Sequence, residues 1–187
     1  MDTRFFNARR GKKMGSNREE RKKFEFLHVF LALKRINTNK DHACMRQVIR
    51  DDEKDLRYLE MKCLAHGGEW RIHKTVNARC PIKAMKYLMK KLIDHPELCA
   101  DIDMEWRSAL LQPECAYGEK RFMLDVDFED NSEVLKVVNE SSGKILQKVK
   151  SPKGWHLICT PFDTRKVCLI PDVSLHRDGY FYIETVK

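Results

Sequence analysis

Residues 122–128 read Phe-Met-Leu-Asp-Val-Asp-Phe, an apolar segment that carries two aspartates in alternate positions. Bulky apolar residues at this density predict a β-strand. Side chains alternate between the two faces of a strand, so Asp125 and Asp127 are expected on one face and Val126 on the other. Neighbouring carboxylates repel each other unless a cation neutralises them, and hard divalent ions such as Mg²⁺ prefer oxygen ligands. The segment therefore predicts a metal site, against the alternative of a strand end where both carboxylates are simply solvated.

A second motif lies downstream, where residues 151–159 read Ser-Pro-Lys-Gly-Trp-His-Leu-Ile-Cys. Residues 151–154 have the composition of a tight turn, and the apolar residues that follow predict a strand. His156 stands at the start of this strand and Ser151 in the turn. An imidazole N–H and a hydroxyl can both donate to a phosphate oxygen. The two motifs together predict a metal-dependent site that handles phosphate. Taken alone, a histidine such as His156 on an apolar strand is more often a hydrogen-bonded core residue, and only its partnership with the two aspartates makes the functional interpretation as good.

The composition is that of one globular domain. The chain has 187 residues, enough for a substantial core. No apolar run approaches the ~20 residues that a transmembrane helix requires, and residues 1–7 lack the apolar centre of a signal peptide. Seven cysteines are scattered without a CxxC pair, an arrangement typical of a reduced intracellular protein. The sequence therefore predicts a cytoplasmic protein with no membrane partner.

Positive charge is concentrated at the N-terminus. Residues 1–23 contain nine Lys or Arg and three Asp or Glu, and so contribute +6 of the net charge of +8. Such an arm is attracted to a polyanion in a salt-dependent way, because each phosphate contact releases a counterion. A solvated, disordered tail is an equally good interpretation of the same residues.

Residues 24–66 are expected to be helical. The strongly apolar segment at residues 24–36 predicts one helix, and residues 44–64, where apolar and charged residues mix, predict a second. Gly67 and Gly68 end this second helix, since glycine adopts the left-handed conformation at little cost.

Residues 69–187 are expected to form the sheet-rich part of the fold. Alternation of bulky and polar residues predicts a strand at residues 69–77, and Pro81 begins a helix with apolar residues three to four apart. Residues 96–113 predict a helical turn or two, and residues 133–139 a short helix or strand. Further strands are expected at residues 120–128, 145–149, 155–160, 167–170 and 180–186. The prediction is a single α+β domain at residues 24–187, with a helical N-terminal part packed on a mixed or antiparallel sheet.

The two motifs resemble those of the archaeo-eukaryotic primase superfamily, which includes primase-polymerases encoded by phages and plasmids. In that family an apolar strand with DxD or DxE is followed by a strand entered through Ser-x-His or a looser Ser…Gly-x-His. Residues 124–127 resemble the first motif and residues 151–156 the second. Residues 70–84 resemble the strand, turn and helix that precede the catalytic strand in small phage relatives. The resemblance covers roughly residues 69–187 and implies an RRM-like sheet in a catalytic core.

The resemblance also implies roles for individual residues. Asp125 and Asp127 would hold one or two Mg²⁺ or Mn²⁺ ions, and Ser151 and His156 would contact the phosphates of an incoming nucleotide. His156 counts with the two aspartates among the catalytic residues. The basic residues expected as further phosphate partners are Lys153, Arg165 and Arg79.

The third acidic residue of the family's pattern has no clear counterpart here. No aspartate on an apolar strand follows His156 at the usual distance. Asp172 is the first candidate for this third metal ligand, with Asp178 and Glu184 behind it. This departure puts competent polymerisation in doubt.

Three functions are therefore open. The resemblance implies a metal-dependent nucleotidyltransferase of primase type, from a phage or mobile element, that acts on nucleoside triphosphates and a nucleic-acid template. The uncertain third carboxylate favours a catalytically inactive primase-like module that binds nucleic acid, a nucleotide or a protein. A metal-dependent nuclease could use the same pair of aspartates.

Overall fold

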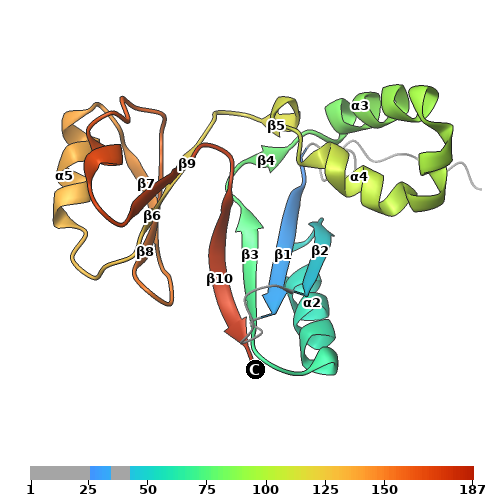
Figure 1. The fold of residues 1–187 in the computed structure, drawn as a ribbon, viewed down its shortest axis with the longest axis horizontal. Coiled ribbons are helices and arrows are strands. Elements are labelled where there is room, and N and C mark those ends of the chain that lie inside the picture. Colours follow the sequence, from blue (N-terminus) through green and yellow to red (C-terminus); the bar gives the residue numbers. More distant parts are fainter. Residues whose placement is uncertain (1–25, 35–42) are drawn as a thin grey trace, which may run out of the picture.

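The computed structural model describes residues 26–34 and 43–187. It is an α+β fold with two four-stranded sheets that stand side by side and a two-stranded ribbon above them (Figure 1). All strand pairings in these sheets are antiparallel. The α+β class is thus confirmed, and the sheet is of the antiparallel kind. The predicted basic arm, residues 1–23, lies outside the described residues.

The sheet that we name sheet I has the strand order β10-β3-β1-β2. Its strands are β1 (His28–Lys34), β2 (Cys44–Ile49), β3 (Trp70–Thr75) and β10 (Tyr180–Val186). Helix α2 (Asp52–His66) covers one face and packs Leu59 against the buried side chains of Phe30 and Ile72. Asp51 caps this helix, since its side chain accepts a hydrogen bond from the N–H of Lys54.

The predicted helices at residues 24–36 and 44–64 are wrong in part, because β1 and β2 lie there. Strand β1 is central, so one face packs on α2 while Leu31 and Leu33 line the opposite face. Because β1 carries apolar side chains on both faces, its sequence is a continuous apolar run, which periodicity cannot distinguish from a buried helix. Helix α2 begins only after the cap at Asp51, and it ends at Gly67 as predicted.

Sheet II has the strand order β7-β8-β6-β9. Its strands are β6 (Phe122–Val126), β7 (Ile145–Lys150), β8 (Trp155–Cys159) and β9 (Val173–His176). Helix α5 (Ser132–Glu140) follows β6, and a 3-10 turn (Val167–Leu169) precedes β9. The order along the chain is therefore strand, helix, strand, strand, helical turn, strand, with the first and third strands at the centre. Helix α5 packs Val134 and Val138 onto Leu124 and Leu157.

The strands predicted at residues 120–128, 145–149, 155–160 and 180–186 are all present, as β6, β7, β8 and β10. Residues 167–170 were expected to be a strand and instead form the 3-10 turn. Val167 is fully buried against the α5 side of sheet II, so a short helical turn supplies the apolar contact that the sequence suggested a strand would make.

A helical layer covers one end of sheet I. It consists of α3 (Pro81–Asp94), a 3-10 helix (Pro96–Asp101) and α4 (Ile102–Leu110). Strand β4 (Ala78–Arg79) leads into this layer, a short 3-10 turn (Pro113–Cys115) follows it, and β5 (Ala116–Tyr117) pairs with β4. Leu88 and Leu110 of the two helices pack on Leu27 and Val29. Among the described residues, no helix is both long and apolar enough to cross a bilayer.

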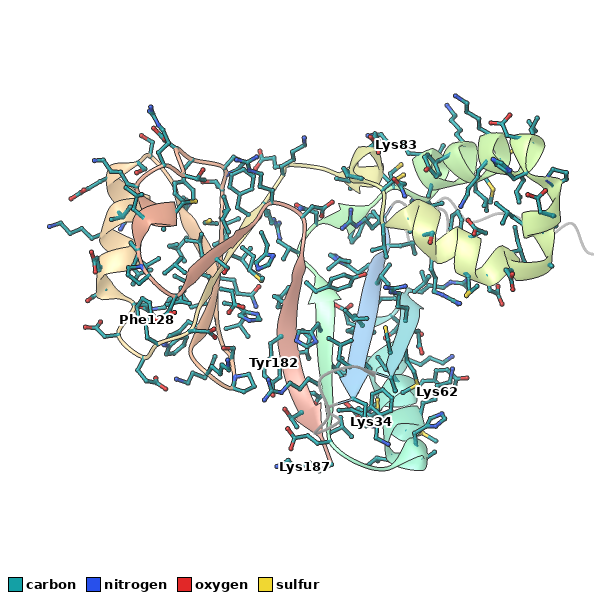
Figure 2. The ribbon with its side chains drawn as sticks, viewed as in Figure 1. Lys34, Lys62, Lys83, Phe128, Tyr182 and Lys187 are labelled. Atoms are coloured by element: carbon teal, nitrogen blue, oxygen red, sulfur yellow. The ribbon has the colours of Figure 1, made fainter. Side chains whose placement is uncertain are left out.

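The two sheets meet through a small apolar cluster that joins Val76 and Phe181 of the sheet I side to Met123 and Ile158 of sheet II. Each sheet has its helix on the outer face, so the remaining inner faces look toward each other. Tyr182 of β10 lies between the two sheets (Figure 2). This arrangement leaves a cleft beyond the apolar cluster.

Candidate functional site

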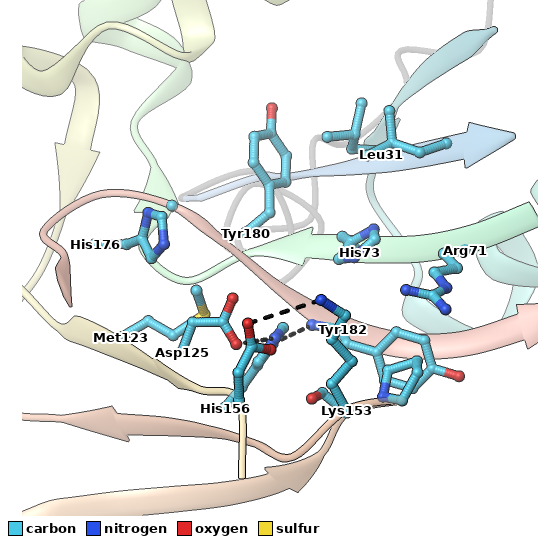
Figure 3. A pocket seen from close by; sticks show the side chains of 15 residues that line it. Leu31, Arg71, His73, Met123, Asp125, Lys153, His156, His176, Tyr180 and Tyr182 are labelled. Carbon is cyan, nitrogen blue, oxygen red and sulfur yellow. Dashed lines mark hydrogen bonds and ion pairs between the residues drawn. The ribbon is translucent and has the colours of Figure 1, made fainter. Parts of the chain in front are cut away.

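The cleft between the sheets has a volume of about 460 Å³. Its walls come from β6, β8 and the preceding turn on one side, and from β3 and β10 on the other (Figure 3). The polar residues that line it are Asp125, Asp127, Ser151, Lys153, His156, His176, Arg71, His73, Tyr180 and Tyr182. Most of the residues predicted from the two motifs therefore meet in one place.

Strand β6 delivers the two aspartates to the cleft by simple alternation. Leu124 and Val126 are fully buried toward α5, so Asp125 and Asp127 project from the opposite face, as predicted. Their side chains remain 35% and 45% exposed, respectively. Both carboxylates thus keep oxygen atoms that a ligand in the cleft could reach.

His156 lies directly opposite Asp125 in the pairing of β8 with β6. Its Nδ1 accepts a hydrogen bond of 2.8 Å from the backbone N–H of Tyr182. A nitrogen that accepts carries no proton, so the neutral ring bears its proton on Nε2. That Nε2 lies 3.3 Å from Oδ1 of Asp125 and donates toward it. The contact from β10 therefore fixes the tautomer of His156 and directs its N–H at the carboxylate.

The same hydrogen bond affects the pKa of Asp125. The N–H of His156 favours the charged carboxylate and so holds the pKa of Asp125 below its ordinary value, against the opposing effect of partial burial. Nearby His176 and Lys153 lower the pKa of Asp125 in the same direction. Asp125 is consequently ionised throughout the neutral range and presents a negative oxygen to the cleft.

The turn between β7 and β8 is held close to the end of β6. Ser151 is buried, and its hydroxyl accepts a hydrogen bond of 3.1 Å from the N–H of Gly154. A Cβ on Gly154 would stand 2.0 Å from the carbonyl oxygen of Val126, so only glycine fits at this position. Glycine therefore lets the turn lie against β6, with Ser151 beside the two aspartates.

Lys153 projects from this turn into the cleft, with its ammonium 3.9 Å from Oδ2 of Asp127. Its side chain is 64% exposed, so the pair is weak and readily rearranged. A cation in this position can neutralise part of the aspartate charge or contact an anionic ligand. The structure thus brings Lys153 and Ser151 to the cleft, where both were predicted.

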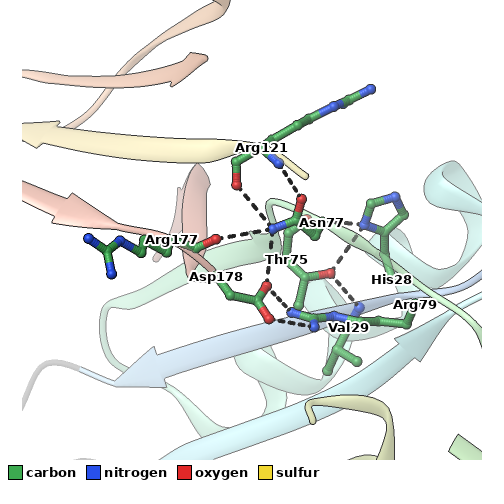
Figure 4. A network of polar contacts seen from close by, with 8 residues as sticks. All are labelled: His28, Val29, Thr75, Asn77, Arg79, Arg121, Arg177 and Asp178. Atoms are coloured by element: carbon green, nitrogen blue, oxygen red, sulfur yellow. Dashed lines mark hydrogen bonds and ion pairs between the residues drawn. The ribbon is translucent and has the colours of Figure 1, made fainter. Parts of the chain in front are cut away.

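Arg79 does not reach the cleft. Its side chain is only 2% exposed, and both terminal N–H groups donate to Asp178, at 2.8 and 2.6 Å (Figure 4). Asn77 bridges the same carboxylate to the backbone carbonyl oxygen of Arg121. Arg79 and Asp178 therefore pair with each other at the junction of the sheets, and the structure brings neither side chain to the cleft where the phosphate and metal roles were predicted.

The remaining predicted residues also lie outside the cleft lining. Arg165 is exposed and pairs with Asp163 in the loop after β8. The backbone carbonyl oxygen of Asp172 accepts a hydrogen bond from the N–H of Asp127, but its side chain is not part of the lining. Glu184 interacts with Glu60 of α2. None of them brings a third carboxylate to Asp125 and Asp127 in the described part of the chain.

The wall opposite the aspartates contains residues that the sequence did not single out. Arg71 and His73 of β3 and Tyr180 and Tyr182 of β10 line it. The alternating pattern of residues 69–77 predicted a strand, and Arg71 and His73 are its polar positions. Nothing local could show that this face looks toward the aspartates, because the facing is created by the packing of two sheets.

The oxygen ligands in the cleft are of the kind that a hard divalent cation prefers. The two carboxylates on the cleft side of β6 and its end offer oxygen ligands of the kind that Mg²⁺ and Mn²⁺ accept, with open sides for water or phosphate oxygens. A pair of ions needs a further acidic ligand, and the described residues contain no group of three His, Cys, Asp or Glu side chains placed to hold a metal. Asp125 and Asp127 are therefore the residues of the cleft that could hold one cation, and they offer no ligand set for two.

Comparison with known proteins found no match, either among protein-family models or among curated proteins and solved structures. The geometry of the cleft is therefore what bears on function.

Proposed function

We propose that this chain is a metal-dependent nucleotidyltransferase of primase type, acting on nucleoside triphosphates and a nucleic-acid template with Mg²⁺ or Mn²⁺. The observation that carries the proposal is the convergence in one cleft of Asp125, Asp127, His156, Ser151 and Lys153. These side chains come from the two motifs that resemble the superfamily, and the fold places both motifs on adjacent strands with side chains on one face.

The topology of sheet II supports the proposal. Strand, helix, strand, strand, helical turn, strand, with the order β7-β8-β6-β9, is the arrangement of RRM-like and ferredoxin-like sheets. The aspartates stand on its first strand and His156 on its third, the two central strands. This is the type of sheet that the resemblance implies for a catalytic core.

Each residue has a definite task in this proposal. Asp125 and Asp127 hold the cation, which when bound supplies charge stabilisation for the transferred phosphoryl group. His156 keeps Asp125 ionised and oriented, because its own ring is fixed by the backbone of Tyr182. The hydroxyl of Ser151 and the ammonium of Lys153 are placed to contact phosphate oxygens.

A specific observation favours a second candidate. In the described residues no third carboxylate joins the two aspartates, and two-metal transfer normally needs one. A catalytically inactive module that binds nucleotide or nucleic acid in the same cleft would need only the single cation. The two candidates therefore differ in turnover and share the ligand site.

The test is incorporation of labelled nucleoside triphosphates on a single-stranded template with Mn²⁺, in wild type and in Asp125→Asn. The nucleotidyltransferase predicts product that disappears in the variant. Thermal unfolding with Mn²⁺ and nucleoside triphosphate accompanies this assay, because a ligand that binds the folded state raises the stability as the logarithm of its concentration.

Three results are informative. Binding that depends on Asp125 without turnover supports the inactive module. Strand scission without added triphosphate identifies a nuclease. Absence of both binding and turnover in wild type overturns the proposal, provided that the protein is folded by circular dichroism.

A further inference from the structure

The wall of the cleft formed by β3 carries two nitrogen-bearing side chains whose purpose the fold does not explain. Arg71 and His73 are two positions apart on this strand, so both project from its inner face. Figure 3 shows them across the cleft from Asp125 and His156. The cleft therefore has one wall with two carboxylates and one wall with a guanidinium and an imidazole.

Two atoms on the β3 wall are buried without a hydrogen-bond partner among the described residues. They are Nε of Arg71 and Nδ1 of His73. Leaving a buried polar atom unpaired costs free energy, and more so for a charged group, so most such atoms in folded proteins have a partner. Both nitrogens are covered by protein atoms, whereas the terminal N–H groups of Arg71 are not among the buried atoms and have no protein partner in the described residues. These N–H groups are the ones that an acceptor from a ligand in the cleft could meet.

We propose that Arg71 and His73 form an anion subsite that holds the polyphosphate of a nucleotide opposite the two carboxylates. This subsite rests on the proposed function for the identity of the whole ligand. A guanidinium forms two parallel hydrogen bonds with a phosphate, and such charge-assisted bonds are about twice as strong as neutral ones. Phosphate is thus an anion that the N–H groups on this wall can bind.

A polyphosphate fits the cleft better than an isolated anion. The carboxylates of Asp125 and Asp127 repel any anion that approaches without a cation. A single phosphate bound to Arg71 is therefore attracted by the guanidinium and repelled by the carboxylates opposite. A chain of phosphates can contact Arg71 and His73 at one end and share a cation with the aspartates at the other. The cleft volume of about 460 Å³ lies within the range of roughly 300–1,000 Å³ typical of small-molecule sites.

The probe for this subsite is inorganic tripolyphosphate, which lacks base and sugar, titrated calorimetrically into the full chain with Mn²⁺ present. Arg71→Gln is expected to weaken binding about 10- to 100-fold, the loss of one or two charge-assisted hydrogen bonds. Arg71→Lys should recover part of the affinity, because lysine keeps the positive charge but lacks the planar, paired N–H donors of arginine. Arg57→Gln is the matched control, since Arg57 lies on α2 with a side chain that is 71% exposed. Equal affinity of wild type and Arg71→Gln, with both proteins folded, overturns the subsite.

A second set of titrations separates this proposal from the proposed function. Loss of Mn²⁺-nucleotide binding in Asp125→Asn combined with unchanged tripolyphosphate binding in Arg71→Gln overturns the subsite and supports the metal site. The reverse pattern supports the subsite and overturns the metal-dependent function. A short single-stranded oligonucleotide serves as the other source of phosphate. If Arg71→Gln weakens binding of the oligonucleotide and leaves tripolyphosphate unaffected, the assignment to a nucleotide polyphosphate is overturned.

Discussion

Asp178 and Asp125 each face a basic side chain, but their surroundings differ. Asp178 receives both terminal N–H groups of Arg79, whose side chain is 2% exposed, at the junction between the sheets. Asp125 receives one N–H of His156 and remains 35% exposed in the cleft. The Arg79–Asp178 pair is largely shielded from solvent and holds the chain in place at this junction. The second pair leaves carboxylate oxygens open, which is what a ligand site requires.

The closed pair should carry the largest effect on stability. Asp178→Ala leaves the buried guanidinium of Arg79 without its partner, and breaking a buried pair in this way costs about 3–5 kcal/mol. Because the side chain of Asp178 is 23% exposed, we expect the lower end, about 3 kcal/mol. Urea unfolding monitored by circular dichroism measures it.

The matched control is Asp163→Ala, which removes an aspartate from an exposed pair with Arg165. Exposed pairs contribute about 0–1 kcal/mol, so this variant should unfold close to wild type. Similar losses in the two variants would contradict the distinction between a closed and an open environment.

Gly154→Ala should have the next largest effect. The new Cβ would stand 2.0 Å from the carbonyl oxygen of Val126 and 2.7 Å from the backbone nitrogen of Phe128, so backbone has to move. Overpacking of this kind costs about 1–3 kcal/mol and should push the turn carrying Ser151 away from β6. Urea unfolding measures the resulting loss in the free energy of unfolding. Lys153→Ala, at an exposed position of the same turn, should leave stability unchanged, and equal stability of both variants would show that the contact is not tight.

Glu184 tests a third environment, in which one carboxylate meets another. Burial and the neighbouring Glu60 raise the pKa of Glu184 from its ordinary 4.5 to about 7. The folded state then binds the proton more tightly than the unfolded state, so stability falls as pH rises from about 4.5 to about 7. Glu184→Gln should therefore be more stable than wild type at pH 8, by about 1 kcal/mol since water screens a part-buried group.

Thermal unfolding at pH 4.5 and pH 8 checks this expectation. At pH 4.5 the wild-type carboxyl is largely protonated, so the two proteins should unfold at nearly the same temperature. A difference that is the same at both pH values would point to packing instead of charge.

The open pair should show the smallest effect on stability and the largest on binding. In Asp125→Asn the amide oxygen can still accept the N–H of His156, so we expect a change within about 1 kcal/mol. The stabilisation by Mn²⁺ with a nucleoside triphosphate should disappear, because a neutral amide is a poor substitute for a charged oxygen ligand. A loss of stability as large as that of Asp178→Ala would mean that Asp125 has a structural role.

Local patterns were sufficient where a site depends on one strand or one turn. The alternation in β6 predicted the common face of Asp125 and Asp127, and the turn composition predicted the position of Ser151. The pairing of Arg79 with Asp178 could not be predicted, because it joins residues 99 positions apart. The β3 side of the cleft could not be predicted, since the facing of Arg71 toward Asp125 depends on how two sheets pack.

The order of strands in sheet I has a consequence for folding. Sheet II and α5 form from a continuous segment, residues 122–176, whereas β3 pairs with β10 in a register that joins Thr75 to Tyr180. Closing such a long loop is entropically costly and makes folding slow. During synthesis, sheet II can fold while the edge of β3 that later pairs with β10 is still unpaired. The cleft is therefore completed last, and until β10 arrives this edge of sheet I is open to pairing with other chains.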